Sequence, residues 1–371
     1  MKNCLGIINL SELENNIQEL TKVRPIASIP FAGRYRIIDF TLSNFVNSGI
    51  NNVAVFTQNK FRSLVDHIES GKSWDLDRKI TGITVFNPAF NYNKIVQRYG
   101  DIEHFYQSLS WLKHASEEYV FISRSYMICN IDISKAYDYH RKSGKDITII
   151  NKKVKNEEKF YELDTLNTDP SGHLISIGKN TGKEKEINLS MEMYIMRKSL
   201  LIKIIENAVE NGDSNYLKQA LFKELNNYSV TTYDYSGYLA CINSSKNYYD
   251  ANMDMLDYDI YQQLFKADRP ILTKVKDEPS TIYRETSDVK NSLVANGCDI
   301  KGTVKNSIIF RDVKIDEGVT IEDSIIMQRT HVGANSSLKN VILDKYVSIS
   351  KESRLSGDKK VPYIVSKGIE L

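Results

Sequence analysis

The last quarter of the chain contains a short repeat that few folds can accommodate. Triplets with one polar and two aliphatic residues recur at intervals of 15, 17 and 16 residues, at 292–294, 307–309, 324–326 and 340–342. Further β-branched triplets lie between them, at 313–315, 319–321 and 347–349. Aliphatic triplets at this close spacing are typical of hexapeptide repeats, in which three short strands form each coil of a left-handed parallel β-helix. We therefore expect a β-helix domain over residues 291–371, with a buried Ile/Val column and lateral edges that favour oligomers.

Residues 30–57 have the pattern of a loop, a helix and a strand. Apolar residues recur at near-helical spacing between Phe40 and Val46, and Gly49 can end that helix in a left-handed conformation. The run at 53–57 is apolar and β-branched, as in a buried strand, and the run at 4–8 fits a first strand. These elements form a βαβ unit, so we expect an α/β, Rossmann-like domain with a mostly parallel sheet.

The expected domain organisation is residues 1–267 for the α/β domain, 268–290 for a linker and 291–371 for the β-helix. The linker is predicted because this segment contains two prolines and lacks clear periodicity. A chain of 371 residues is long enough for two domains.

Composition excludes several classes of function. A net charge of +2 gives no reason to expect nucleic acid or an anionic membrane as partner. We find no apolar run of about 18 residues and no signal peptide, so we expect no membrane association. The four cysteines are far apart, which indicates a reducing cytoplasm and argues against a zinc site.

Residues 30–50, PFAGRYRIIDFTLSNFVNSGI, resemble the segment P-F-G-G-K/R-Y/F-R-I-I-D-F-x-L-S-N-x-x-N-S-G-I of the glucose-1-phosphate adenylyltransferases, or ADP-glucose pyrophosphorylases. The resemblance extends to the Ala-Asn-Met-Asp sequence at 251–254 and to the hexapeptide repeats, and so covers nearly the whole chain. It implies a nucleotidyltransferase domain. The family reaction joins ATP and glucose 1-phosphate to give ADP-glucose and pyrophosphate, with Mg²⁺ bound.

The family's phosphate-binding elements are missing. Its glycine-rich loop L-x-G-G-x-G-T-R-L corresponds to residues 8–16, which contain no glycine or arginine, and whose Glu12 and Glu14 would repel a triphosphate. We interpret this segment as a solvated loop. The lysine of the family's K-P-A-V-P-F motif falls on Ile26, and Arg24 lies two residues out of register. Further on, Asp101 is expected to cap a helix over 102–114.

Both metal-binding aspartates are replaced. The first position falls at Ser125 or Tyr126, directly after Arg124, whose positive charge opposes a cation. The second position is Cys241, and a thiol is a poor ligand for Mg²⁺, which prefers oxygen. We therefore expect loss of Mg²⁺ binding, no metal site, no other cofactor and no catalytic residue.

The sugar-binding residues of the family are partly kept. Its E-K-P motif is lost at 179–181, whereas Ser190 and Tyr238 remain in segments similar to S-M-G-I-Y and G-Y-W-K-D. We interpret these two residues as a vestigial sugar site. Glu192 replaces a glycine of the family and places an anion where a sugar phosphate would bind.

This pattern resembles the non-catalytic, GlgD-type branch of the family, which implies an inactive partner subunit of a catalytic GlgC-type chain in glycogen biosynthesis. The resemblance also implies a phosphate-bearing effector near Arg34 and Arg36; alternatively, both arginines are surface charges that pack on the β-helix. Two other functions stay open. The chain could be an active sugar-1-phosphate nucleotidyltransferase with a rebuilt site, or a hexapeptide acyltransferase that uses His331. The sequence does not identify the effector, the subunit ratio or whether the chain associates with itself.

Overall fold

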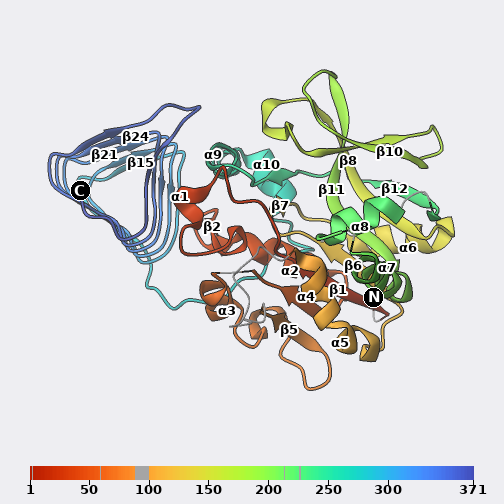
Figure 1. The fold of residues 1–371 in the computed structure, drawn as a ribbon. Helices are drawn as coiled ribbons and strands as arrows, with labels where there is room; N and C mark the ends of the chain where they lie inside the picture. The colour runs from red at the N-terminus through yellow and green to blue at the C-terminus, as the bar shows by residue number, and fades with distance from the viewer. Residues whose placement is uncertain (2, 59, 88–99, 213, 225–226) are drawn as a thin grey trace. The chain divides into compact units, whose positions relative to one another are not determined.

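The computed structural model describes residues 1–371 except 2, 59, 88–99, 213 and 225–226 (Figure 1). Packing divides the chain into two compact units, which we describe separately. The first comprises residues 1–12, 40–237 and 269–272, and the second comprises 13–39, 238–268 and 273–371. The second unit therefore contains the β-helix together with two segments that we had expected in the α/β domain.

The first unit is built on a sheet whose central strands are parallel. These are β5 (Gly82–Phe86), β4 (Asn52–Phe56), β1 (Cys4–Asn9) and β6 (Tyr119–Ser123), in that order across the sheet. In the chain, α2 (Ile37–Asn47) connects β1 to β4, and Gly49 ends it with a φ of 76°. The predicted βαβ unit and its parallel sheet are confirmed.

Antiparallel strands extend this sheet on the β6 side. The long strand β11 (Glu186–Arg197) runs antiparallel to β6 and to β8 (Ile147–Lys155), and β12 (Val230–Asp234) lies parallel to β8. A hairpin of β9 (Asp164–Thr168) and β10 (Leu174–Lys179) pairs with β11 through β9. Two further elements of the unit are β7 (Met127–Ile128) and α3 (Arg62–Ile68).

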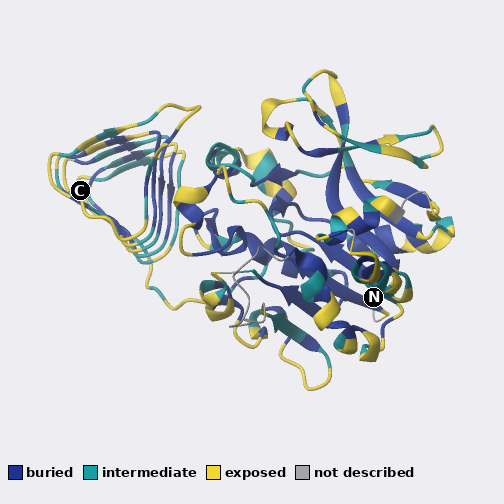
Figure 2. Ribbon diagram, in the orientation of Figure 1, coloured by how far each residue is buried: buried dark blue, intermediate teal, exposed yellow. Residues whose placement is uncertain are grey.

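Alternation along β1 directs side chains to two sides of the sheet. Leu5 and Ile7 belong to a buried cluster with α4 (Asp101–Gln107), α5 (Leu109–His114), α7 (Lys198–Asn211) and α8 (Leu217–Glu224). Gly6 points the other way, where the Phe45 ring of α2 lies so close that a Cβ atom would meet it at 2.5 Å. The helix α6 (Ile133–Ser143) packs on β8, β11 and β12. Figure 2 shows this sheet as the most deeply buried part of the unit.

The second unit contains short elements in addition to the β-helix. They are α1 (Gln18–Thr21), the hairpin β2 (Pro30–Phe31) and β3 (Tyr35–Arg36), the strand β13 (Ala240–Cys241), α9 (Ser245–Met253) and α10 (Tyr258–Leu264). Turns of 3-10 helix lie at Ile26–Ser28 and Asp254–Leu256 here, and at Lys72–Trp74 and Glu158–Phe160 in the first unit.

The β-helix consists of three five-stranded parallel sheets, one on each side of every coil. The first contains β14 (Ile282–Tyr283), β17 (Asp299–Ile300), β20 (Lys314–Ile315), β23 (His331–Val332) and β26 (Ser348–Ile349). The second contains β15 (Asp288–Lys290), β18 (Thr303–Lys305), β21 (Thr320–Glu322), β24 (Ser337–Lys339) and β27 (Arg354–Ser356). The third contains β16 (Leu293–Val294), β19 (Ile308–Ile309), β22 (Ile325–Ile326), β25 (Val341–Leu343) and β28 (Tyr363–Val365).

Aliphatic side chains fill the interior of the coils, as the repeat predicted. Ile300, Ile315, Val332 and Ile349 form one buried column along the first sheet. The left-handed parallel β-helix is therefore confirmed. Its first coil begins earlier than expected, because β14 and β15 already lie within 268–290, the segment that we had assigned to a linker.

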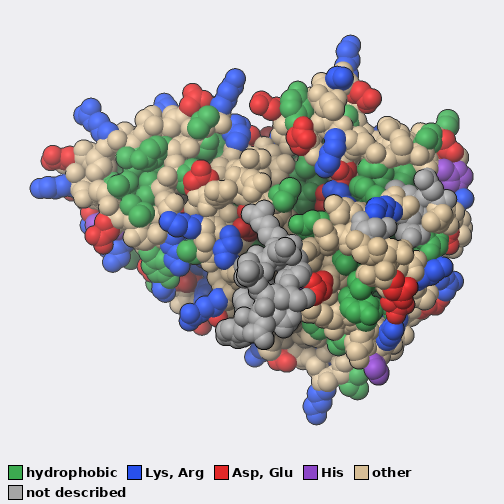
Figure 3. Space-filling view, in the orientation of Figure 1, with side chains coloured by type: hydrophobic (Ala, Val, Ile, Leu, Met, Phe, Trp, Pro, Cys, Tyr) green, Lys and Arg blue, Asp and Glu red, His purple; other side chains and the backbone are tan. Residues whose placement is uncertain are grey.

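None of the helices in the described part of the chain combines the length and the apolar content that a bilayer crossing requires. On the face drawn in Figure 3, basic and acidic side chains are interspersed.

Candidate functional site

Polar side chains gather in the first unit where β1 and β6 end. In parallel sheets this edge, at the carboxyl ends of the strands, is the usual place for ligands. Asn9 is the last residue of β1, and Arg124 follows β6 directly. The Arg124 guanidinium donates from Nη1 to the Asn9 carbonyl oxygen at 3.4 Å and to the Ser11 hydroxyl. An arginine therefore occupies the edge at which the family resemblance places a cation.

Arg124 forms a buried ion pair with Glu192 of β11. Its Nε lies 3.1 Å from Oε2 of Glu192, and the two side chains are only 11% and 9% exposed. Burial acts to raise the pKa of the Glu192 carboxyl, but the charges of Arg124 and Lys218 outweigh it and hold that pKa below its usual value. Glu192 is thus an anion inside the protein. The two residues that depart from the family pattern neutralise each other.

The ion pair continues into a chain of alternating charges. Nζ of Lys218, on α8, lies 2.6 Å from Oε1 of Glu192 and also contacts Asp164 of β9. Lys179 binds the other oxygen of Asp164 at 2.7 Å. The void lined by Asn9, Arg124, Glu192 and Lys218 is about 10 Å³, which is scarcely enough for one water molecule.

The backbone at Glu192 adopts a left-handed conformation, which glycine adopts more readily than other residues. Its φ is 51°, in the left-handed region, within an irregular stretch where the pairing of β11 with β8 shifts between Ser190 and Met193. The buried hydroxyl of Ser190 accepts a hydrogen bond from the Glu192 backbone N–H at 3.3 Å. The predicted sugar residue Ser190 therefore supports the turn that aims Glu192 at Arg124.

Glu12 is bound to the segment after β6. Its Oε1 accepts hydrogen bonds from the backbone N–H of Ser125 at 2.8 Å and from the Ser125 hydroxyl at 2.9 Å. Burial raises the pKa of Glu12, and the charge of Arg124 offsets part of this effect. The interpretation of residues 8–16 as a solvated loop is therefore wrong for Ser11 and Glu12, because both are held by the residues that follow β6.

The residues at this edge do not fit Mg²⁺. Ser125 carries no carboxylate and is bonded to Glu12, and Arg124 supplies positive charge. Across the described residues, His, Cys, Asp and Glu form no group of three or more that could hold a metal ion.

Asp101 does not cap the helix that follows it. Its carboxylate accepts from Asn9 Nδ2 at 2.7 Å, from Ser11 Oγ at 2.6 Å and from the backbone N–H of Leu217, the first residue of α8, at 2.5 Å. The expected single helix over 102–114 is also wrong, because the chain forms α4 and α5 with Ser108 between them. Asp101 thus joins the start of α8 to the end of β1.

Two other predicted site residues belong to the second unit. The Tyr238 hydroxyl donates to Oδ2 of Asp254 at 2.8 Å, and burial together with Asp254 raises the pKa of Tyr238. Cys241 lies in β13 as a buried thiol that forms no disulfide within the described residues. Tyr238 is therefore engaged by a carboxylate of its own chain.

Arg34 and Arg36 lie in the second unit beside different cationic residues. Arg34 is exposed, and its guanidinium lies 5.6 Å from the centre of the Tyr35 ring. Burial lowers the pKa of Arg311, and the nearby charge of Arg34 contributes to this shift. Arg34 and Arg311 therefore form one cationic neighbourhood.

Arg36 contributes to a second cationic neighbourhood around Lys345. The pKa of Lys345 is well below its usual value, first because of burial and then because of the charges of Arg36, Arg24 and Lys367. Sequence inspection missed Lys345 and Lys367, because about 300 residues separate them from Arg36 and no local pattern marks them.

Arg24 is held in a buried ion pair. Its Nη2 lies 2.8 Å from each carboxylate oxygen of Asp344, and its Nε donates to the Leu20 carbonyl oxygen. This arginine therefore does not replace the family lysine that contacts phosphates. His331 lies on the surface of the β-helix, with Nε2 2.8 Å from Oδ2 of Asp316.

Comparisons with known proteins cover nearly the whole chain. Residues 16–234 match the nucleotidyl transferase family, and residues 279–363 match the GlmU-like C-terminal hexapeptide family. The chain is 36% identical over 365 residues to the glycogen biosynthesis protein GlgD of Bacillus subtilis (strain 168), which covers 98% of this chain and 96% of that protein. It is 37% identical to GlgD of Geobacillus stearothermophilus, with the same coverage. It is 31% identical over 349 residues to the glucose-1-phosphate adenylyltransferase of Bacillus cytotoxicus, covering 93% of this chain and 91% of the enzyme.

Proposed function

Because this chain belongs to the nucleotidyl transferase family, within the group of GlgD proteins and glucose-1-phosphate adenylyltransferases, we propose that it is a non-catalytic subunit of ADP-glucose pyrophosphorylase. In this proposal it modulates a catalytic, GlgC-type chain in glycogen biosynthesis in the cytoplasm. Family membership confirms the resemblance drawn from residues 30–50.

The observation that carries the proposal is the ion pair between Arg124 and Glu192. Phosphoryl transfer depends on positioned cationic groups that stabilise charge on the transferring phosphate. Here the arginine at the strand edge is neutralised by a carboxylate of its own chain at 3.1 Å, and Lys218 is neutralised in the same way at 2.6 Å. Among the described residues at this edge, the two cations closest to the strand ends, Arg124 and Lys218, are thus already bound to a carboxylate.

The acidic groups near the edge support the same conclusion. The carboxylate of Glu12 lies against Ser125, and Asp101 is bound to Asn9 and Ser11. Neither side chain offers positive charge to a triphosphate, and an ionised carboxylate here repels one. Removal of a single preorganised donor typically lowers a catalytic rate by about 10²–10³, and several donors of the family are replaced here.

The proposed effector site is at Arg34 and Arg36, which lie beside different cationic residues. Lys345 lies near Arg36; burial first, and then the charges of Arg36, Arg24 and Lys367, lower its pKa against the opposing charge of Asp344, and a bound anion favours its charged form. A phosphate-bearing effector fits this chemistry. An Arg36→Ala variant is expected to lose phosphate binding by calorimetry, with Arg284→Ala, on the exposed β-helix surface, as control.

The experiment that tests the proposal compares three samples. This chain alone, a catalytic GlgC-type chain alone and the two co-expressed chains are assayed with ATP, glucose 1-phosphate and Mg²⁺ for pyrophosphate release. We expect negligible turnover by this chain, co-purification of the two chains, and a higher rate or altered effector response in the mixture. Turnover by this chain alone on the order of 1 s⁻¹ would instead establish the alternative, a nucleotidyltransferase with a rebuilt site.

A further inference from the structure

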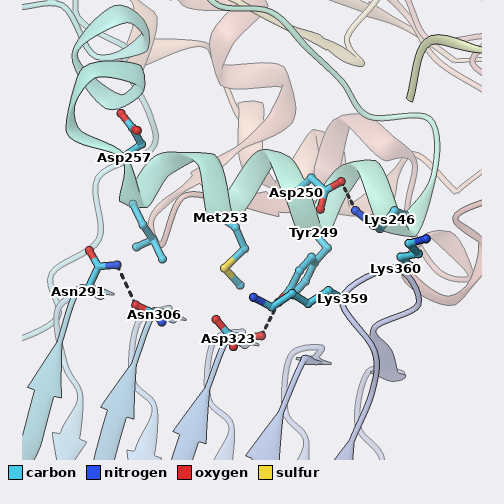
Figure 4. A pocket seen from close by; sticks show the side chains of 11 residues that line it. Lys246, Tyr249, Asp250, Met253, Asp257, Asn291, Asn306, Asp323, Lys359 and Lys360 are labelled. Atoms are coloured by element: carbon cyan, nitrogen blue, oxygen red, sulfur yellow. Dashed lines mark hydrogen bonds and ion pairs between the residues drawn. The ribbon is translucent and has the colours of Figure 1, made fainter. Parts of the chain in front are cut away.

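A groove in the second unit lies between α9 and one corner of the β-helix (Figure 4). Its volume is about 580 Å³, which is within the range of sites for small organic ligands. All of its lining residues belong to this unit, and none belongs to the charged edge of the first unit.

One wall of the groove is a stripe along α9. Lys246, Tyr249 and Met253 recur at helical spacing and face the same side. The Tyr249 hydroxyl donates to the backbone carbonyl oxygen of Asp323 at 2.6 Å. This bond fixes the helix against the coils, so the groove is formed before any ligand binds.

The opposite wall is one corner of successive coils. Asn291, Asn306 and Asp323 occupy this corner with φ values of 43°, 46° and 46°, a conformation that Asn and Asp adopt more readily than most residues. Neighbouring coils repeat at about 4.8 Å, so side chains of the corner form a regular row. Asn291 donates to Asn306 at 2.8 Å, whereas the Asp323 carboxylate accepts no side-chain hydrogen bond within the described residues.

An insertion in the last coil forms one end of the groove. Ile325 pairs with Ile342, 17 residues further on, whereas Ile342 pairs with Ile364, 22 residues further on. The extra residues form a turn in which the backbone groups of Asp358 and Val361 bond each other at 3.0 and 3.1 Å. This turn presents Lys359 and Lys360 at the groove. Neither lysine forms an ion pair within the described parts of the chain.

The chemistry of the lining matches a neutral, polyhydroxylated ligand. Three lysines and three aspartates line the groove, so their formal charges balance; of these, Lys246 and Asp250 pair with each other and Asp257 caps α10. Lysine and asparagine nitrogens donate, carboxylate and amide oxygens accept, and Met253 and Leu256 offer apolar contact. Sugar hydroxyl groups both donate and accept, and sugar rings also have apolar C–H faces.

We propose that this groove binds a neutral oligosaccharide of about two or three hexose units. Since the similar proteins are named for glycogen biosynthesis, the glucan maltoheptaose is the probe for the test. This proposal does not rest on the proposed function, because the groove and the charged edge share no residue.

The test is titration calorimetry of the full chain with maltoheptaose. We expect saturable binding in the wild type and about tenfold weaker binding in Asp323→Asn, which keeps the size and backbone preference of the residue but removes the charged acceptor. Asp316→Asn is the matched control, because Asp316 is also a β-helix aspartate but lies outside the groove. A second variant, Lys359→Ala/Lys360→Ala, changes only the exposed turn and is also expected to weaken binding.

Inorganic phosphate and glucose 1-phosphate serve as competing probes. Binding of either in the groove, lost in the double lysine variant while maltoheptaose gives no saturable heat, would overturn the proposal in favour of an anion site. Equal maltoheptaose affinity in the wild type, Asp323→Asn and the lysine variant would also overturn it. Neither result bears on the pyrophosphate assay, so this proposal and the proposed function fail independently.

Discussion

Substitution of Glu192 tests directly whether ion pairs occupy the edge of the sheet. The Glu192→Gln variant keeps the size of the side chain but removes the charge that neutralises Arg124 and Lys218. Loss of one partner from a buried ion pair typically costs about 3–5 kcal/mol. Because Lys218 still has Asp164 as a partner, we expect the lower end of this range, about 3 kcal/mol.

The Glu192→Gly variant separates charge from backbone strain. It also loses the carboxylate, but glycine adopts the φ of 51° without the penalty of about 1–2 kcal/mol that other residues incur. We therefore expect the glycine variant to lose only about 2 kcal/mol, although it removes more atoms than glutamine does. The order of stability is predicted to be wild type, then glycine, then glutamine.

Urea unfolding followed by tryptophan fluorescence measures this order. Both tryptophans, Trp74 and Trp111, lie in the first unit, so the signal reports on the unit that contains Glu192. With a slope of about 3 kcal/mol per molar urea, the glutamine variant should unfold at about 1 M less urea. Glu186→Gln, at the exposed start of the same strand, is the control and should unfold with the wild type. A glutamine variant as stable as the wild type, or a glycine variant less stable than glutamine, would refute the reasoning.

Two further predictions concern other buried ionisable groups. Arg24→Met leaves the Asp344 carboxylate buried without its partner, so we expect the second unit to lose about 3–5 kcal/mol of stability. Urea unfolding followed by circular dichroism measures this loss. The double variant Arg24→Met/Asp344→Asn, which also removes the carboxylate, should recover part of the stability. Burial lowers the pKa of His140 to about 4, below its usual 6.5. The unfolded chain therefore binds the proton first as the pH falls from about 6.5 towards 4, and stability declines over this range. In the same fluorescence assay, the stability of a His140→Gln variant should decline less steeply as the pH falls. An unchanged dependence of stability on pH would contradict the lowered pKa of His140.

The sequence predicted the elements of both units better than the contacts of the site. The strand at 53–57, the helix ended by Gly49 and the aliphatic triplets were recognisable because local periodicity follows from burial of one face. The first coil of the β-helix was missed, because Ile282 and Tyr283 are exposed and the segment lacks the aliphatic doublets of the later coils.

The site required tertiary information. Arg124 and Glu192 were each recognised as departures from a family motif, but their contact spans 68 residues and depends on the irregular turn in β11. Asp101 was assigned to the nearest helix start by a local rule, whereas its carboxylate bonds the start of α8, 116 residues away. Rules based on neighbouring residues cannot predict which residues so far apart in the sequence will form a contact.

Glu192 also indicates whether this edge of the sheet has only lost the family's catalytic residues or has a stable arrangement of its own. A carboxylate at a left-handed backbone position, only 9% exposed, conflicts with backbone preference and with solvation at once. The buried Tyr194 hydroxyl at this edge has no hydrogen-bond partner among the described residues, but simple loss of catalytic residues would leave charged groups unpaired as well. Instead, Arg124 and Lys218 each bind a separate oxygen of this carboxylate, and the remaining void is about 10 Å³. Because Arg124, Glu192 and Lys218 lie on three separate elements and satisfy one another, this edge is an organised structure, which supports the proposal that the chain acts through its surfaces rather than through this pocket.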